Sequence, residues 1–187
     1  MASLGTDPQA RSARSNISPV QREELRALQA PLKDRYADAP DAAMITLSAT
    51  GTLGEGVSCA VQTGRAIAEA GLHPATGGDG SLLCSGDMLL EALVACAGVT
   101  LRAVATSLGI SVSSGRVRAE GELDFRGTLG VDRDAPVGFS AIRLSFELES
   151  DADEKQLETL RKLVERYCVV YQTLASTPTV SSTLIAE

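Results

Sequence analysis

Residues 84–109, CSGDMLLEALVACAGVTLRAVATSLG, decide how this chain folds. Ser85 suits an N-cap, Asp87 places negative charge in the first turn, and Gly109 suits a helix end. The pattern therefore predicts one helix over residues 86–108, about 34 Å long. Apolar or small side chains occupy nearly every face, so this helix must be covered on most sides. We expect it at the centre of the fold, with sheet and a second subunit around it.

Composition and charge narrow the class of protein. The chain has 187 residues, of which 44% are apolar and 22% charged, as in a soluble protein with one core of ordinary size. A net charge of -7 and the lack of Trp argue against binding to nucleic acid or to anionic membranes. Glu91 and Arg102 inside the apolar helix argue against a membrane span, and residues 1–20 do not resemble a secretory signal. We expect a cytoplasmic protein.

The sequence around the helix predicts an α+β domain over residues 43–187. Segments 44–50 and 57–63 are rich in β-branched residues and flank a turn-like stretch, which predicts a hairpin; residues 64–71 suggest a further strand. Residues 116–126 and 141–149 alternate apolar and charged side chains, which indicates antiparallel strands with one exposed face.

Two amphipathic helices flank this core. Within an N-terminal extension, residues 1–42, Ser18 and Pro19 suit a helix start and Pro40 suits its end. Asp153 with Gln156 resembles a capping box for the second helix. The stripe of the first helix is Leu25, Leu28 and Leu32, and that of the second is Leu157, Leu160, Val164 and Tyr167. Cys168 follows the second stripe, and the segments 169–174 and 177–185 predict a turn and a final strand.

The residue inventory leaves thiol chemistry as the main candidate. The chain has a single histidine, His73, and its four cysteines lack a C-x-x-C pair, so we expect neither a metal site nor a cofactor. The sequence also lacks a G-x-S-x-G elbow and the lysine of a phosphate loop. In a reducing compartment the cysteines are packing residues or redox groups rather than structural disulfides. Taken alone, Cys96 is more often core packing than catalyst.

Two motifs add a resemblance. Residues 77–101, GGDGSLLCSGDMLLEALVACAGVTL, resemble the helix-entry signature of the OsmC/Ohr family of organic hydroperoxide reductases. Residues 165–174, ERYCVVYQTL, resemble the second cysteine motif of that family, with both alternating strands lying between the two motifs. The resemblance covers about residues 43–187. It implies antiparallel sheets wrapped around a long central helix, in an intertwined homodimer with active sites at the subunit interface.

The resemblance also implies a mechanism and its residues. Cys96 would attack an organic hydroperoxide, Cys168 would form a disulfide with the oxidised Cys96, and an external thiol would reduce the pair. QTGRAI resembles the Gly-Arg strand turn of the family, which makes Arg65 the candidate cation, although a surface arginine is an equal reading. Asp87 is the acidic candidate at the helix start, where it also suits a role in helix capping and the helix dipole. The alternative is a non-catalytic OsmC-like protein that binds a small apolar ligand at the dimer interface.

Overall fold

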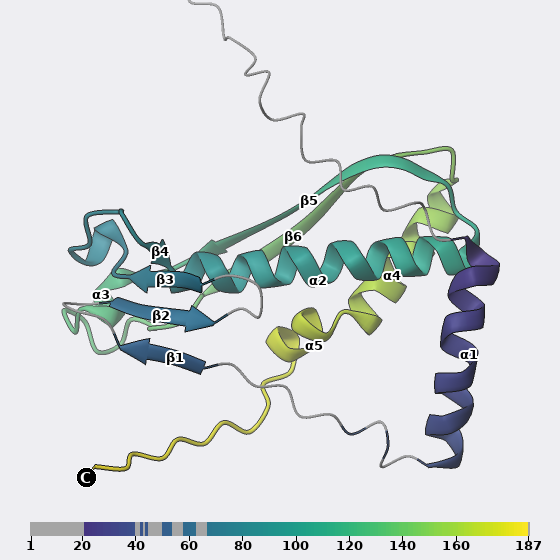
Figure 1. Ribbon diagram of the computed structural model, residues 1–187. Coiled ribbons are helices and arrows are strands. Elements are labelled where there is room, and N and C mark those ends of the chain that lie inside the picture. The colour runs from purple at the N-terminus through teal and green to yellow at the C-terminus, as the bar shows by residue number, and fades with distance from the viewer. Residues whose placement is uncertain are drawn as a thin grey trace, which may run out of the picture.

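The computed structural model describes residues 21–39, 42, 44, 50–53, 58–62 and 67–186. They form a mixed structure of helices and strands built along the long helix α2 (Ser85–Leu108), as Figure 1 shows. The other helices are α1 (Arg22–Asp38), α3 (Phe125–Thr128), α4 (Glu154–Tyr167) and α5 (Val169–Ala175), with a 3-10 turn at Pro74–Thr76. The strands are β1 (Thr50–Leu53), β2 (Ser58–Gln62), β3 (Ile67–Gly71), β4 (Leu83–Cys84), β5 (Val112–Glu122) and β6 (Ala141–Ser150). The predicted fold class is confirmed.

The strands form two sheets. The first has the order β1-β2-β3-β4, in which β1, β2 and β3 are antiparallel and β4 joins β3 in parallel. The predicted hairpin is present, but β1 occupies Thr50–Leu53, within the stretch expected to turn. Its pairing with β2, which sets Leu53 opposite Cys59, outweighs the weak strand propensity of Gly51. The second sheet is the antiparallel pair β5–β6, where the predicted alternation is confirmed.

Helix α2 begins and ends almost where the sequence indicates. Gly109 terminates it with a left-handed φ of 72°, as predicted. Its N-cap is Cys84 rather than Ser85, because the β3–β4 pairing keeps the backbone extended through Cys84. At its far end the Arg22 guanidinium of α1 donates to the Ser107 carbonyl over 2.5 Å, which satisfies one open carbonyl of the last turn.

Helix α1 confirms the predicted N-terminal helix, although with a different start. Gln21 caps it and exchanges hydrogen bonds with Glu24, whereas Ser18, Pro19 and Pro40 lie outside the described residues. Leu28 and Leu32 of its stripe are exposed, so most of this apolar face packs against nothing in the described part of the chain.

The core is built on one stripe of α2. Leu93, Ala97, Leu101 and Ala105 are its buried residues. They pack with Leu160 and Val164 of α4, with Cys168, and with the inner face of the β5–β6 sheet. Elsewhere on α2 the cover is incomplete, and the side chain of Val99 is 74% exposed. By length and composition α2 could cross a bilayer, but in this fold it is the helix on which the core is built.

The structure corrects three predictions of local structure, all for segments that follow β5. Phe125 leaves the strand and begins α3, because the Asp124 carboxylate accepts the Arg126 N–H and caps this turn. Residues 169–174, expected as a turn, lie in α5. The strand expected over residues 177–185 is extended but has no strand partner among the described residues. The capping box of α4, Asp153 with Gln156, is confirmed.

The packing of α4 on α2 gives a stability prediction. Leu160 is 1% exposed and lies at the centre of this contact. Leu160→Ala leaves a cavity that the neighbouring helices cannot fill, so we expect the free energy of unfolding to fall by about 2–5 kcal/mol. Urea denaturation checks this, with Leu129→Ala as the control because Leu129 is 55% exposed. Equal losses in both variants would contradict the proposed core.

Candidate thiol site

The two cysteines of the candidate site lie on α2 and at the non-helical junction between α4 and α5. Cys96 lies on α2 beside the buried Ala97 and is itself half-buried. Cys168 joins α4 to α5: its N–H donates to the Val164 carbonyl, and its own carbonyl accepts the Gln172 N–H, both over 2.9 Å. The extended backbone of Cys168 ends one helix and begins the next. Its side chain is fully buried.

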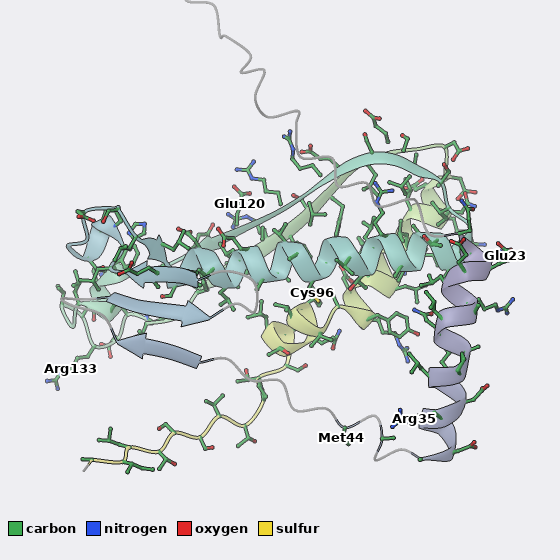
Figure 2. The ribbon with its side chains drawn as sticks, viewed as in Figure 1. Glu23, Arg35, Met44, Cys96, Glu120 and Arg133 are labelled. Carbon is green, nitrogen blue, oxygen red and sulfur yellow. The ribbon has the colours of Figure 1, made fainter. Side chains whose placement is uncertain are left out.

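The fold brings these two cysteines into one cluster. Cys168 packs with Leu93 and Ala97 of α2, and Cys96 packs against the same group. Figure 2 shows Cys96 on the side of α2 that faces α5. Residues widely separated in the sequence therefore meet at the junction of α2, α4 and α5, as the sequence resemblance implies. Both thiols are free.

Backbone amides in the first turn of α5 are among the groups that affect the pKa of the Cys96 thiol. Burial alone raises the pKa of the Cys96 thiol, but four donors oppose it and hold the pKa below its ordinary value. These donors are, in order of effect, the Val170 N–H, the Cys168 thiol, the Val169 N–H and the Thr100 hydroxyl. The amides of a first helical turn have no partner within the helix, so they are free to stabilise a thiolate.

Cys168 behaves in the opposite way. Burial raises its pKa, and the hydrogen bond and negative charge of Cys96 raise it further, against the lowering effect of the Tyr171 and Val170 amides. Two thiols in contact cannot ionise independently, because the second charge would form beside the first. Cys96 is therefore the first of the two thiols to ionise, and Cys168 keeps its proton to higher pH. The site can thus supply one nucleophile and one adjacent thiol.

Asp87, another predicted site residue, lies apart from this pair. Asp87 is exposed in the first turn of α2, about 14 Å along the helix axis from Cys96. There it lines a separate cavity of about 380 Å³ with Cys84, His73 and Phe125. Its position suits interaction with the helix dipole, and a catalytic role remains a prediction. Arg65 lies outside the described residues.

His73 and Cys84 belong to this second cavity, at the start of α2. His73 Nδ1 accepts the Ala75 N–H over 3.0 Å, and its ring stacks on Phe125 with 5.0 Å between centroids. This agrees with a loop-packing histidine rather than a base. Cys84 is half-buried and lies apart from the thiol pair. Within the described residues, His, Cys, Asp and Glu side chains form no group able to hold a metal ion.

Sequence reasoning missed the donors to Cys96. Thr100 follows Cys96 by one helical turn, so its position on the same face of α2 could have been noticed. The two valine amides could not, because their role depends on α5 starting at Val169, where the sequence suggested only a turn. Backbone groups leave no signature in residue type.

The comparisons with known proteins agree with this geometry. The family model described as OsmC-like protein matches residues 78–183, which contain both cysteines of the pair and more than half of the chain. This chain belongs to the OsmC-like protein family. A search of curated proteins finds no significant match.

Solved structures of OsmC-like proteins share the fold of this family member. An OsmC-like protein from Mycoplasma pneumoniae is 20% identical, with a TM-score of 0.60 over 71% of this chain and 89% of that one. An organic hydroperoxide resistance protein OsmC from Legionella pneumophila is 17% identical, with a TM-score of 0.57 over 72% of this chain and 92% of that one. An OsmC-like protein of unknown function from Vibrio cholerae is 15% identical, with a TM-score of 0.57 over 70% of this chain and 94% of that one. At these identities the likeness establishes the fold.

The Val169 amide allows a test of how Cys96 is ionised. Val169 is the first residue of α5, where proline fits a helix, and the extended backbone of Cys168 suits a residue before proline. Val169→Pro removes one donor to Cys96, so we expect the pKa of Cys96 to rise. Alkylation of Cys96 by iodoacetamide at pH 7 should then slow, because less thiolate is present.

Val169→Ala is the matched control, since it shortens the same side chain but keeps the N–H. Rates are followed by mass spectrometry of the peptide that carries Cys96, over pH 5–10. The alanine variant should keep the pH midpoint of the natural protein. A midpoint that is unchanged in Val169→Pro, with α-helical content retained, would show that this amide does not stabilise the thiolate.

Proposed function

We propose that this OsmC-like protein is a thiol peroxidase that reduces organic hydroperoxides through Cys96 and Cys168. The observation that carries the proposal is the contact between a thiol of lowered pKa and a buried thiol of raised pKa. A peroxidase needs both: a thiolate to attack, and a second thiol close enough to form a disulfide. A cysteine retained only for packing needs neither. This favours the enzyme over a binding protein without catalysis.

In the first step the Cys96 thiolate attacks one oxygen of the peroxide and the O–O bond breaks. Cys96 becomes a sulfenic acid, and the other oxygen leaves as an alcohol after taking up a proton. The sulfur is oxidised by two electrons and the peroxide is reduced by two. The donors around Cys96 favour this step because they lower the pKa of its thiol and so favour the thiolate.

In the second step the Cys168 sulfur attacks the sulfenic sulfur of Cys96. A disulfide forms, and the hydroxyl leaves as water with the proton of the Cys168 thiol. Once the thiolate of Cys96 has been consumed, the charge that raised the pKa of Cys168 is gone, which favours its ionisation at this moment. Two molecules of an external thiol, of the kind that a cytoplasm supplies, then reduce the disulfide by thiol–disulfide exchange and leave joined as a disulfide, which returns both cysteines to thiols.

The surroundings of the pair favour an organic peroxide. Val170, Tyr171 and Leu174 of α5 are partly buried and pack against the cluster that holds both cysteines. They offer apolar contact to an alkyl or aryl group, which hydrogen peroxide lacks. We assign Arg65 the role of a cation beside the bound peroxide or the thiolate, on the resemblance of QTGRAI alone.

A homodimer is part of this proposal. The long helix α2 exposes Val99 and part of Leu89, although nearly all its faces are apolar. A soluble chain seldom leaves such a helix uncovered, so a second copy packed along α2 would complete its cover. This arrangement would place the thiol pair next to the subunit interface.

Variants of the two cysteines test the reaction. With cumene hydroperoxide and dithiothreitol, we expect Cys96→Ser to abolish peroxide consumption because the attacking sulfur is gone. Cys168→Ser should consume about one equivalent and then slow, with a sulfenic acid that dimedone traps on Cys96. Cys84→Ser is the matched control and should turn over normally, since Cys84 lies in another cavity.

The same peroxide, added without dithiothreitol, separates the two functional hypotheses. Reduced protein should lose two thiols per chain with one equivalent of cumene hydroperoxide. Full retention of thiols in the natural protein would contradict the peroxidase and favour a protein that binds an apolar ligand without reacting. Equal rates with hydrogen peroxide would contradict the preference for organic substrates.

A further inference from the structure

Helix α5 has no capping side chain of its own. It is seven residues long, and its N-cap residue, Cys168, makes no side-chain capping hydrogen bond. The backbone hydrogen bond that returns to the Cys168 carbonyl comes from the Gln172 N–H, over 2.9 Å. The amides of residues 169–171 precede that bond, so they have no partner within α5. A buried amide without a partner is costly, and these three therefore need acceptors outside the helix.

The two sulfurs of the thiol pair supply these acceptors. The Val169 and Val170 amides donate to the Cys96 sulfur. The Tyr171 and Val170 amides donate to the Cys168 sulfur. The redox pair is therefore the cap of α5, and one of its two members, Cys96, belongs to another helix. A cap of this kind depends on the chemical state of its sulfurs.

The other contacts that hold α5 in place are modest. Val170, Tyr171 and Leu174 pack on the cluster that contains both cysteines. The Gln172 side chain donates to a backbone carbonyl of α4 over 2.8 Å. Beyond α5 the residues 176–186 are exposed. A helix of seven residues is not stable by itself in water, so α5 keeps its position through these contacts and through the sulfur cap.

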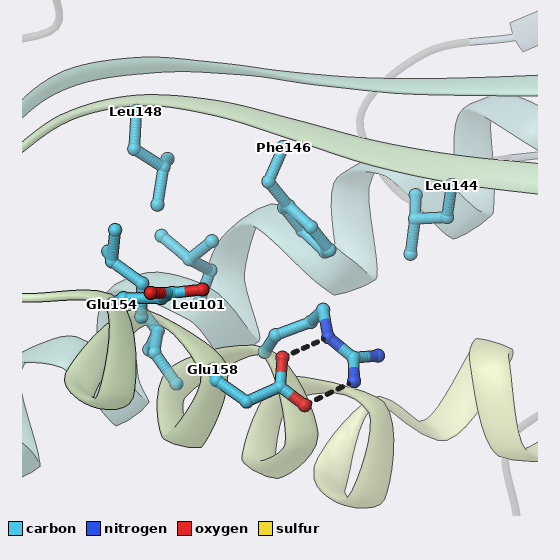
Figure 3. Close-up of a pocket in the computed structure, with 9 residues that line it drawn as sticks. Leu101, Leu144, Phe146, Leu148, Glu154 and Glu158 are labelled. Carbon is cyan, nitrogen blue, oxygen red and sulfur yellow. Dashed lines mark hydrogen bonds and ion pairs between the residues drawn. The ribbon is translucent and has the colours of Figure 1, made fainter.

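The packing of α5 against the second sheet is loose within one chain. A cavity of about 460 Å³ lies between β6 and α5, and Tyr171 and Leu174 are among its lining residues. A second cavity, of about 600 Å³, lies between β6 and α4 and shares Leu144 and Phe146 with the first. Figure 3 shows these two side chains pointing from β6 toward α4. The space on this side lets α5 move away from the cysteines without breaking a close-packed contact with the sheet.

Oxidation of the pair weakens this cap. A thiolate is a strong hydrogen-bond acceptor, and it carries the charge that a helix N-terminus favours. A sulfur in a disulfide is neutral and accepts hydrogen bonds only weakly. When Cys96 and Cys168 form a disulfide, the amides of residues 169–171 lose their acceptors. The closed position of α5 then becomes less favourable, because the unpaired amides gain by contact with water.

We propose that α5 is a redox-controlled gate over Cys168. The sulfurs of the reduced pair hold the gate closed, and formation of the disulfide releases it, so that an external thiol reaches Cys168. The inference rests on the proposed function, since it assigns a device to the reduction half of that reaction. Cys168 is 0% exposed in the closed state, whereas Cys96 is half-buried, so Cys168 is the sulfur that a reductant reaches only after opening.

Attack at Cys168 is also the faster route for reduction. The first external thiolate bonds to the Cys168 sulfur, the bond between the two cysteines breaks, and Cys96 leaves with the electron pair as a thiolate. The pKa of Cys96 is the lower of the two, and a thiol of lower pKa leaves faster. A second external thiolate then bonds to the sulfur of the first, Cys168 leaves, and the external pair departs as a disulfide. The two protons released by the external thiols balance the two cysteine thiolates formed.

Hydrogen exchange measures whether the sulfurs hold α5. Diamide oxidises thiols without peroxide, and mass spectrometry identifies the disulfide that forms. We expect the amides of residues 169–175 to exchange at least about fivefold faster in the oxidised chain, the loss of one helix cap, while α4 keeps its rates. Unchanged or slower exchange in α5, with the disulfide between Cys96 and Cys168 present, would overturn the gate and leave the peroxidase in place.

Variants of Cys96 test the cap without oxidation. In the reduced chain, Cys96→Ala removes an acceptor of the α5 amides and should speed exchange in α5 about fivefold. Cys96→Ser keeps an oxygen acceptor at the same position and should retain most of the protection. Cys84→Ala is the matched control and should leave α5 unchanged, since Cys84 lies in another cavity. Equal exchange in the serine and alanine variants of Cys96 would mean that packing rather than capping holds α5, and would overturn the gate.

The rate of disulfide reduction tests whether opening admits the thiol. Leu174→Ala removes apolar contact between α5 and the cysteine cluster, so α5 should open more often. Dithiothreitol should then reduce the diamide-formed disulfide at least about threefold faster than in the natural chain. Leu129→Ala is the control, because Leu129 is 55% exposed in another part of the chain. Faster exchange in α5 of Leu174→Ala with an unchanged rate of reduction would overturn the gate.

The outcomes separate the gate from the peroxidase. A chain that is inert to cumene hydroperoxide but meets these expectations with diamide loses the peroxidase and keeps the gate. A chain in which diamide forms no disulfide between Cys96 and Cys168 overturns both.

Discussion

The non-helical junction at Cys168, between α4 and α5, packs against one stripe of α2. Both the core and the thiol pair depend on this contact. Cys168 ends α4 and begins α5 with one extended residue, and its buried side chain lies between Leu93 and Ala97. The same junction directs the amides of Val169 and Val170 toward Cys96. A continuous helix through Cys168 would satisfy these amides internally and leave Cys96 as a packing residue. Among the described residues, the groups that lower the pKa of Cys96 are thus backbone amides, a thiol and a hydroxyl rather than a charged side chain.

The single chain leaves several apolar surfaces incomplete. α2 exposes Val99, α1 exposes Leu28, and the C-terminal residue Leu184 is 94% exposed. The homodimer proposed above would cover part of this apolar surface with a second copy.

The sequence predicts the parts of this structure that depend on the spacing of apolar residues and on the residues that cap helices. The long helix, the β5–β6 alternation and the Asp153 capping box follow from residue type alone, because each is a local pattern. The strand over residues 51–53, where a turn was expected, and the α5 helix were mispredicted, since pairing with β2 and packing on α2 override weak local preferences. The cysteine pair was found through two motifs, whereas its amide donors and the remote position of Asp87 required the three-dimensional arrangement.

The central claim is that Cys96 and Cys168 form one interacting pair in which Cys96 ionises first. Ultraviolet titration of thiolate absorbance near 240 nm, in a chain with Cys59 and Cys84 replaced by serine, tests it directly. The account predicts two separate steps, one below and one above the ordinary thiol pKa, with Cys96→Ser abolishing the lower step. A single transition of two thiols at the ordinary pKa, unchanged in shape by Cys96→Ser, would contradict it.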